Sequence, residues 1–495
     1  MALPLPYCLG TRLDKSADMG YDDNEWKFSE NKFSINGGVY MFIGRDDELR
    51  QLSEAFTGPR SATLLYGKRR VGKTTLIKEA LERQQKPYVY YECLRGTMRD
   101  NIDGLTRELE RLGLLTFQTT FSSLRDVFAY LNTLPRQLII VIDEYPYLKA
   151  MTPPETVDST FQAIIDEHLA NIDLVVSGSH IGMMRDMLRE GNALYGRFGT
   201  VIQLKELSYR VAAAFYPAKS AYERIGFHGV FGGSPFVLEQ LRGGETLRDN
   251  IIGTILTENH PVRLYAAHFL MSDYSRSVNS ERIFAALGNG RKKYTELENL
   301  LDAKKTGNLS KQLKSLLELD ILAKNAPINR AGDAKKVKYE INDNLMRFWF
   351  AYVYRNQSAL RMLGAEAFYD QYVAPTLTEF ISRRFEALCR DYFSLLARQG
   401  KLPGIRDIGT FYYDDPAART NGEFDVALDF GGSYTICEAK YLKKPMALDE
   451  IHREIGQIRA IRDIEVSQIG FISACGFDRK EEGCLYYTGD DLYAD

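Results

Sequence analysis

The sequence predicts an α/β protein with a parallel-sheet core in its first half and a smaller α/β domain at its C-terminal end. Three observations carry this prediction. An apolar run at residues 62–65 leads into a glycine-rich loop and then a helix, the order strand, loop, helix. Residues 138–142 are all apolar, as in a strand buried on both faces of a parallel sheet. Residues 424–430 and 434–440 alternate around Gly-Gly, which is typical of a two-residue hairpin.

Composition limits the class of protein. The chain has 495 residues, which suggests about three domains. Its 63 Lys and Arg residues nearly balance 66 Asp and Glu residues, so a basic surface for nucleic acid would have to be local. The six cysteines form no Cys-x-x-Cys pair, which argues against a zinc ribbon or a disulfide framework. No apolar run approaches the ~20 residues that cross a bilayer, and the N-terminal residues make a poor signal peptide. We therefore expect a soluble cytoplasmic protein with no membrane partner.

The segment before the glycine-rich loop has two parts. Residues 1–37 show little periodicity, and residues 34–38 have a loop composition, so we treat them as an N-terminal extension. The turn that contains Gly44 and Arg45 then opens an amphipathic helix. Because this segment lies shortly before the loop, we expect Gly44 and Arg45 to pack near a nucleotide base.

The glycine-rich loop matches the phosphate-binding pattern G-x-x-x-x-G-K-[ST] from Gly67 to Thr74. Its glycines let backbone N–H groups point at phosphate oxygens, and the following helix adds its positive N-terminal end. Lys73 would reach the β- and γ-phosphates, and Thr74 would offer its hydroxyl to Mg²⁺. A nucleotide and Mg²⁺ are thus the expected ligands. The expected nucleotide contacts are Gly67, Lys68, Arg69, Arg70, Val71, Gly72, Lys73, Thr74 and Thr75.

A second nucleotide signal follows the apolar run at 138–142, where Asp143 and Glu144 stand at the carboxyl end of the predicted strand. Asp143 would complete the Mg²⁺ shell with Thr74, and Glu144 would orient or deprotonate the attacking water. Alone, an Asp-Glu pair after a strand is equally a helix-start signal.

Further along, the predicted strand at 173–176 ends in Ser177 and Ser179, which are candidates to sense the γ-phosphate, with a simple serine-glycine turn as the alternative. Arg197 is a candidate cation for the transition state, with a surface arginine as the alternative. Helical segments between residues 209 and 262 surround Gly232-Gly-Ser-Pro-Phe236 and are interpreted as a small helical lid.

Three short helical segments, at 280–287, 294–301 and 309–319, precede a predicted hairpin, the element order of a winged helix. In that geometry the third helix enters the major groove and the wing lies over phosphates. The alternative is a relay that packs against the nucleotide domain. The aromatic segment that follows, at 342–354, is expected to be core. The predicted DNA contacts are Ser310, Lys311 and Lys314 on the third helix and Arg330, Lys335, Lys336 and Lys338 on the wing.

In the C-terminal hairpin, pairing of Phe430 with Ser433 would place Asp425 opposite Glu438, and Glu423 opposite Lys440, on one face. Like charges directly opposite destabilise a sheet unless something lies between them. We therefore expect Asp425 and Glu438 either to share a divalent cation or to raise each other's pKa.

The first half resembles the archaeal-type ATPases of the signalling (STAND) branch, which is related to AAA+ proteins. The matching features span roughly residues 40 to 240: Phe42-Ile-Gly-Arg, the Gly67–Thr74 loop, the Ile-Asp-Glu strand, Ser-Gly-Ser, Leu-Tyr-Gly-Arg and Gly-Gly-Ser-Pro. The resemblance implies ATP binding, slow hydrolysis and a conformational switch, and it names no substrate.

The C-terminal hairpin resembles the PD-(D/E)xK nuclease superfamily, a domain that frequently accompanies these ATPases. Asp425 matches the first acidic position and Glu438-Ala-Lys440 the E-x-K, while Phe424 replaces the usual proline. The resemblance implies Mg²⁺ on Asp425 and Glu438, with Lys440 orienting the attacking water. It further implies an acidic helix residue at Glu386 and a phosphate contact at Gln457.

These inferences divide the chain into an extension (1–37), a P-loop ATPase domain (38–205), a helical lid (206–272), a winged helix (273–355) and a C-terminal restriction-endonuclease-like α/β domain (356–495). The expected function is an ATP-hydrolysing switch coupled to a DNA-binding, nuclease-like module. The alternative is a regulatory ATPase whose last two domains only bind DNA or a protein partner, or another copy of the chain.

Overall fold

The computed structural model describes residues 32–35, 38–58, 62–115, 119–273, 280–303, 308–415, 420–461 and 464–494. The chain divides into two units, residues 1–43 and 44–495. In the first unit, β1 (Lys32–Ile35) pairs antiparallel with β2 (Gly38–Met41). The loop expected from residue 34 is thus partly strand, while most of the predicted extension lies outside the described residues. No helix in the described residues is long and apolar enough to cross a membrane.

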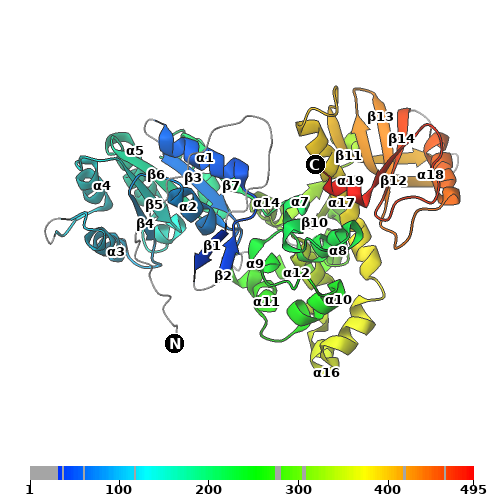
Figure 1. The fold of residues 1–495 in the computed structure, drawn as a ribbon, viewed down its shortest axis with the longest axis horizontal. Coiled ribbons are helices and arrows are strands. Elements are labelled where there is room, and N and C mark those ends of the chain that lie inside the picture. Colours follow the sequence, from blue (N-terminus) through cyan, green and yellow to red (C-terminus); the bar gives the residue numbers. More distant parts are fainter. Residues whose placement is uncertain are drawn as a thin grey trace. The chain divides into compact units, whose positions relative to one another are not determined.

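The second unit begins with a five-stranded parallel sheet in the order β4-β5-β6-β3-β7 (Figure 1). Every residue of β3, β5 and β6 is buried, as their apolar runs predicted. Because β3 lies between β6 and β7, its carboxyl end places the glycine-rich loop between the ends of two neighbouring strands. The strands are β3 (Ala62–Gly67), β4 (Tyr88–Glu92), β5 (Leu138–Asp143), β6 (Ile172–Gly178) and β7 (Thr200–Leu204).

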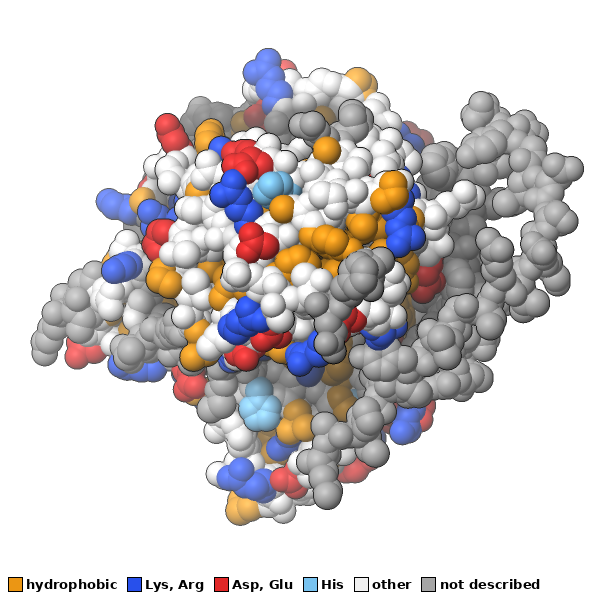
Figure 2. Space-filling model, turned by 90° about the vertical axis from the view of Figure 1, so that its left-hand side faces the viewer, with side chains coloured by type: hydrophobic (Ala, Val, Ile, Leu, Met, Phe, Trp, Pro, Cys, Tyr) orange, Lys and Arg blue, Asp and Glu red, His pale blue; other side chains and the backbone are white. Residues whose placement is uncertain are grey.

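Helices cover this sheet because each has one apolar face. Leu105, Val127 and Phe161, on three of them, are fully buried in the core that the strands form. Figure 2 shows the surface toward α3–α5 in Figure 1, where acidic and basic side chains mix among hydrophobic ones. Because charges of both signs are mixed, the electrostatic potential over this surface is weak. The helices are α1 (Asp46–Thr57), α2 (Lys73–Glu82), α3 (Met98–Arg111), α4 (Leu124–Asn132), α5 (Pro154–Glu167) and α6 (Ile181–Asp186).

The predicted lid is helical. Ser208, Ser220 and Thr246 are the N-caps of α7, α8 and α10, and each accepts a hydrogen bond from a free backbone N–H group at the start of its helix. The helices are α7 (Tyr209–Ala212), α8 (Ala221–Phe231), α9 (Pro235–Leu238), α10 (Leu247–Asn250) and α11 (Pro261–Asp273).

The next segment has the three helices and the hairpin expected at 280–342, with a short third strand in the sheet order β8-β10-β9. Its identity as a winged helix stays a prediction. Leu309, Leu313 and Leu316 bury one face of the third helix. The elements are α12 (Ser280–Leu287), β8 (Lys292–Lys293), α13 (Tyr294–Leu300), α14 (Leu309–Glu318), β9 (Leu322–Asn325) and β10 (Lys338–Ile341).

The aromatic segment after the hairpin packs inside the protein, as predicted. Phe348, Trp349, Phe350 and Tyr352 are all buried. It continues into long helices that lead to the last domain. The helices are α15 (Asn344–Phe348), α16 (Gln357–Phe368) and α17 (Leu377–Arg398).

The C-terminal domain is a mixed five-stranded sheet, antiparallel from β11 to β13 and parallel from β13 to β15 (Figure 1). One continuous cluster of buried apolar residues extends from Leu207 in the predicted lid to Leu492, so the last three predicted domains share a core. The elements are β11 (Asp407–Asp415), β12 (Thr420–Asp429), β13 (Ser433–Lys440), α18 (Leu448–Ala460), β14 (Glu465–Ser473), β15 (Cys484–Thr488) and α19 (Gly489–Tyr493).

Candidate functional site

The glycine-rich loop folds back over the start of α2. A Cβ atom on Gly67 would lie 2.2 Å from the Leu204 carbonyl oxygen, so only glycine lets β3 pass the end of β7 this closely. Gly72 has φ +94° at the N-cap of α2. The buried Lys73 ammonium donates to the carbonyl oxygens of Gly67 and Lys68, both at 3.1 Å. Its charge therefore lies inside the loop, where the sequence predicts phosphate.

The predicted metal-shell pair meets although its members are far apart in sequence. Thr74 Oγ1 donates to Asp143 Oδ2 at 3.1 Å. Tyr90 donates its hydroxyl proton to the same oxygen, and burial followed by the Asp143 charge raises the pKa of Tyr90. Sequence reasoning missed Tyr90, whose only signal was its place on β4, the strand that pairs with β5. Thr74 and Thr75 are exposed, as ligand contact requires.

Glu144 directly follows Asp143 and has a left-handed backbone, φ 51°. Non-glycine residues seldom adopt this conformation, and those that do are concentrated at functional sites. Its carboxylate accepts from Ser179 Oγ at 2.8 Å and from the Ser179 backbone N–H at 3.3 Å. Ser179 is therefore placed to orient Glu144. Ser177 is fully buried, and its Oγ has no hydrogen-bond partner in the described structure.

Arg45 ties the loop to the sheet. Its Nη2 donates to the carbonyl oxygens of Val71, at 3.2 Å, and Lys205, at 2.5 Å, and its Nη1 pairs with Glu48 at 3.1 Å. Gly44 has φ +69°, and a Cβ there would lie 2.5 Å from Val211 Cγ1. These two residues brace the loop backbone, and their contact with a nucleotide base stays a prediction.

The lid contacts the outer side of the loop. Ser234 Oγ donates to the Arg70 carbonyl oxygen at 3.2 Å. The Arg70 guanidinium lies 3.9 Å from the centre of the Phe236 ring and 4.9 Å from that of Tyr265. Arg70 was expected to contact nucleotide, whereas here it is held on aromatic side chains of the lid. Arg69 donates to the Tyr147 hydroxyl at 3.1 Å.

Arg197 lies far from the glycine-rich loop of its own chain, so the prediction that it acts there as a transition-state cation is wrong. The backbone N–H of Gly199, two residues later, donates to the Ala62 carbonyl oxygen at 3.0 Å, at the start of β3. The loop follows the other end of β3, and six residues of strand at ~3.3 Å per residue separate the two edges. Arg197 instead binds Asp166 through Nε and Nη2, both at 3.0 Å.

Lys68 makes a contact that the sequence did not reveal. Its Nζ lies 3.6 Å from Glu206 Oε1 and 4.0 Å from Asp343 Oδ2. Burial and the adjacent Asp343 charge raise the pKa of Glu206 to about 7. Glu206 follows β7, and Asp343 joins β10 to α15. The glycine-rich loop is thus connected by charge to the segment that follows the wing.

The C-terminal register agrees with the prediction. Residues 426–429 pair with 437–434, and Phe430 N–H donates to the Ser433 oxygen at 3.0 Å. Continuing the register places Asp425 opposite Glu438, and Asp425 Oδ2 accepts from Ala439 N–H at 3.2 Å. Burial and the Glu438 charge raise the pKa of Asp425 to about 7, and burial also raises the pKa of Glu438.

Lys440 lies beside this pair and contacts two carboxylates. Its Nζ is 3.2 Å from Glu438 Oε2 and 3.4 Å from Glu454 Oε1. Although burial acts against it, these carboxylates raise the pKa of Lys440. Glu423, which the same register would place opposite Lys440, instead forms an ion pair with Lys338 of β10.

Glu386 and Gln457 are the two remaining residues of the predicted nuclease-like site. Glu386 is close enough for the Asp425 charge, together with burial, to raise its pKa to about 7, and Arg291 Nη1 lies 3.8 Å from it. Gln457 is exposed on α18, whereas Glu454, one turn earlier, contacts Lys440. Among the described residues, no three acidic, histidine or cysteine side chains form a metal-binding group. The cluster therefore offers Asp425 and Glu438 as a pair of oxygen ligands.

Two of the seven predicted DNA contacts, both on the wing, are engaged by the C-terminal sheet. Lys336 Nζ lies 3.5 Å from the centre of the Tyr412 ring, and Lys338 binds Glu423. Asn329 donates to the Tyr412 carbonyl oxygen at 2.8 Å and accepts from its N–H at 3.0 Å. Lys336 and Lys338 thus have partners within the protein, and their contact with phosphate stays a prediction. The exposed members of the predicted surface are Ser310, Lys311, Lys314, Arg330 and Lys335.

Comparison with known proteins bears on both halves of the chain. Residues 42–241 match a family described as an ATPase domain predominantly from Archaea. Residues 349–453 match a family of archaeal and bacterial proteins of unknown function. The first match identifies residues 42–241 as an ATP-binding ATPase domain, as predicted. The STAND branch and the nuclease-like identity stay predictions.

Three individual proteins are similar to this chain. An uncharacterised protein of Methanocaldococcus jannaschii is 29% identical over 369 residues, 73% of this chain and 80% of that protein. An uncharacterised ATP-binding protein of Pyrococcus horikoshii is 29% identical over 164 residues, 30% of this chain and 50% of that protein. The structure of a Walker-type ATPase of Pyrococcus abyssi covers 62% of this chain and 96% of its own, with 20% identity and a TM-score of 0.48.

Proposed function

We propose that this ATPase is a molecular switch whose C-terminal domain is a nuclease-like module that processes DNA with a divalent metal. The observation that carries the proposal is the pair of the half-buried Asp425 and the buried Glu438, with Lys440 at 3.2 Å from Glu438. Two carboxylates and an ammonium on one strand pair suit phosphodiester hydrolysis. The carboxylates would bind a metal ion, and the ammonium would stabilise the negative charge that develops on the phosphate.

The donor set fits Mg²⁺, which is commonly bound through one or two carboxylates, with water and substrate phosphate as the other ligands. Asp425 and Glu438 would hold it, and it would supply a polarised phosphate and an acidified water. Lys440 keeps its proton, because Glu438 and Glu454 both stabilise its charged form. It is therefore available to orient water or to stabilise charge on a phosphate oxygen.

On the ATPase side, Lys73 would bind the β- and γ-phosphates and Thr74 with Asp143 would hold the nucleotide's Mg²⁺. Glu144, oriented by Ser179, would activate water. Lys68 connects the loop with Asp343, so a change in the loop on hydrolysis would reach β10 and α15.

The test is cleavage of duplex, single-stranded and branched DNA by the full chain with Mg²⁺ or Mn²⁺ and with ATP, ADP or no nucleotide. Lys440→Ala should abolish cleavage, while Lys443→Ala, an exposed neighbour after the same strand, should not. Equal cleavage by the Lys440→Ala protein would reject this site. A parallel measurement is the rise in melting temperature with Mn²⁺, made in Thr74→Ala to remove the nucleotide metal, which Asp425→Asn should abolish.

A regulatory ATPase without nuclease activity is the second candidate. The observation that favours it is the contact of the wing with the C-terminal sheet, through Lys336 on Tyr412 and Lys338 on Glu423. A wing engaged in this way acts as a relay between domains rather than as a reader of DNA. Absence of cleavage under every condition, with ATP-dependent binding of a protein or DNA, would select this candidate.

A further inference from the structure

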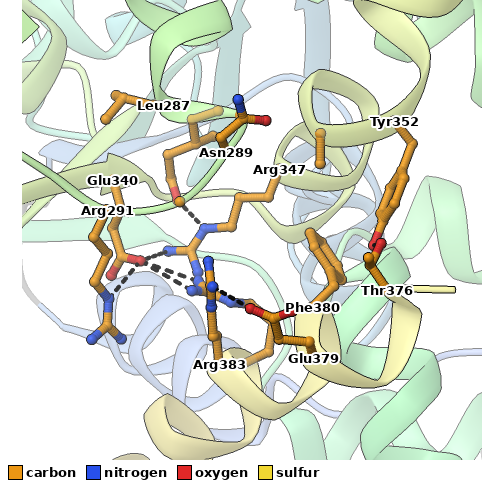
Figure 3. Close-up of a pocket in the computed structure, with 15 residues that line it drawn as sticks. Leu287, Asn289, Arg291, Glu340, Arg347, Tyr352, Thr376, Glu379, Phe380 and Arg383 are labelled. Atoms are coloured by element: carbon orange, nitrogen blue, oxygen red, sulfur yellow. Dashed lines mark hydrogen bonds and ion pairs between the residues drawn. The ribbon is translucent and has the colours of Figure 1, made fainter. Parts of the chain in front are cut away.

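A cavity of about 260 Å³ lies where the predicted winged helix meets α15 and α17 (Figure 3). It is separate from the glycine-rich loop and does not include Asp425 or Glu438. Its volume lies just below the ~300–1,000 Å³ of sites for drug-sized ligands, so it suits a molecule smaller than ATP.

Four arginines line this cavity, Arg291, Arg347, Arg383 and Arg384, against two glutamates. Three of the arginines share one carboxylate, that of Glu340. Arg347 Nη2 lies 3.0 Å from Glu340 Oε2, Arg291 Nε 3.2 Å, and both terminal nitrogens of Arg384 3.2 Å. One carboxylate neutralises only one guanidinium.

The second acid does not restore neutrality. Glu379 pairs with Arg383 at 2.5 Å, and both side chains are about half exposed at the cavity mouth. The four guanidinium groups and two carboxylates leave an excess of two positive charges. Glu386, which lies outside the lining, offsets part of the charge on Arg291. Arg291, Arg347 and Arg384 share Glu340 and are at most 15% exposed, so the positive charge that Glu340 leaves uncompensated is poorly solvated, and an anion would relieve that cost.

The opposite side of the cavity has a different character. In Figure 3 the side chains of Arg347 and Arg383 extend toward the centre, while Tyr352 and Phe380 lie on the other side. A Cβ on Gly290 would lie 2.7 Å from Arg383 Nη1, so this glycine lets the loop approach the guanidinium. A cationic wall thus faces an aromatic wall across a small space.

We propose that this cavity binds a small phosphate monoester that carries an apolar or planar ring, of the size of a nucleoside monophosphate. Guanidinium groups bind phosphate oxygens in a bidentate way, and the negative charge of a phosphate monoester complements the net positive charge of the lining. The ring would lie against Phe380 and Tyr352. Because the cavity walls come from β10, α15 and α17, an occupant would brace the predicted winged helix against the C-terminal domain, whatever reaction that domain performs.

The test is isothermal titration calorimetry of the full-length Lys73→Ala protein, in which the nucleotide loop is disabled, with AMP, ribose 5-phosphate and adenosine. AMP should bind, more tightly than ribose 5-phosphate, and adenosine should not bind measurably. Adding Arg383→Gln should weaken AMP by about tenfold or more, since it removes a charge-assisted contact. Arg361→Gln, at an exposed arginine outside the cavity, should leave AMP binding unchanged.

Failure of AMP to bind, or equal affinity in the Arg383→Gln protein, would overturn the proposal. Adenosine binding as tightly as AMP would overturn the role of phosphate, and equal binding of ribose 5-phosphate would overturn the role of the aromatic wall. If the Lys73→Ala protein does not fold, the same titrations in wild-type protein saturated with ADP and Mg²⁺ answer the same question.

Discussion

Lys68 Nζ lies 4.0 Å from Asp343 Oδ2, so the phosphate-binding loop is in electrostatic contact with the residue that joins β10 to α15. The two residues are distant in sequence and belong to different predicted domains. Glu206 lies beside Asp343, at 3.6 Å from the same Lys68 ammonium, and competes for it. A loop that moves with nucleotide state would therefore change which of the two acids Lys68 neutralises.

Replacing Asp343 with Asn should separate nucleotide binding from its effect on the C-terminal half. ATP affinity should stay within about threefold of wild type, because Asp343 is not in the predicted phosphate cradle. The difference in protease protection of residues 349–453 between the ATP and ADP states should shrink. Asp333→Asn, on the solvent side of the wing hairpin, is the control. An unchanged ATP-dependent protection pattern in Asp343→Asn would contradict this coupling.

Lys73→Ala should lose ATP affinity while remaining folded. The side chain interacts with carbonyl oxygens of the loop and is placed for a charge-assisted phosphate contact worth about 1.5–3 kcal/mol, or roughly 10- to 100-fold in Kd. Fluorescent-nucleotide titration measures the loss, and circular dichroism checks the fold. Arg136→Ala, an exposed cation on the same domain, should bind as wild type. Unchanged affinity in Lys73→Ala would defeat the assignment of the loop.

Glu144→Gln should retain ATP binding and lose at least about 100-fold in turnover, as expected when a general base is removed. Thr74 and Asp143 still meet in this variant, so metal binding should persist. Ser179→Ala should lower turnover by a smaller factor, since it frees the Glu144 carboxylate without removing it. Steady-state phosphate release measures each, with Glu155→Gln on the exposed face of α5 as the control. Normal turnover in Glu144→Gln would move catalysis to another residue.

Any DNA binding should depend on Lys311 and Lys314, which are exposed on α14, and not on Lys336 or Lys338. Neutralising the first pair should reduce the slope of log K against log salt by about 1.8, at ~0.9 for each lost phosphate contact. Neutralising the second pair should leave that slope unchanged and lower the melting temperature. Fluorescence anisotropy over a salt series distinguishes the pairs, and the reverse result would restore the wing to the DNA surface.

The raised pKa of Glu206 makes stability depend on pH. Below pH 4.5 this carboxyl is neutral in both folded and unfolded chains, so it contributes no penalty. Between pH 4.5 and about 7 only the unfolded chain releases the proton, so the free energy of unfolding falls as pH rises, by on the order of 2–3 kcal/mol. Urea unfolding at pH 5 and pH 8 should show a smaller decrease in Glu206→Gln than in wild type. An equal decrease in both proteins would place the titration elsewhere.

Local sequence patterns determined those features of this protein that depend on neighbouring residues in the chain. The loop from Gly67 to Thr74 and its strand and helix follow from residue order, because glycine conformation and helix-terminus charge are local properties. The close approach of Thr74 to Asp143 was also predictable from the sequence, because the ligand-binding residues of a parallel sheet lie at the carboxyl ends of its strands. The register of Asp425 opposite Glu438 followed from a two-residue turn and a side-chain period of two.

The tertiary structure alone decided which charges meet. Arg197 fails as a transition-state cation because β3 separates it from the loop, a fact about strand direction that no residue pattern near Arg197 contains. Lys338 binds Glu423, and three arginines converge on Glu340, because packing brings distant segments together. The partners in such ion pairs depend on where packing places each side chain and how deeply it is buried. The sequence therefore determined the helices, the strands and their local chemistry, and the fold determined which charged side chains meet.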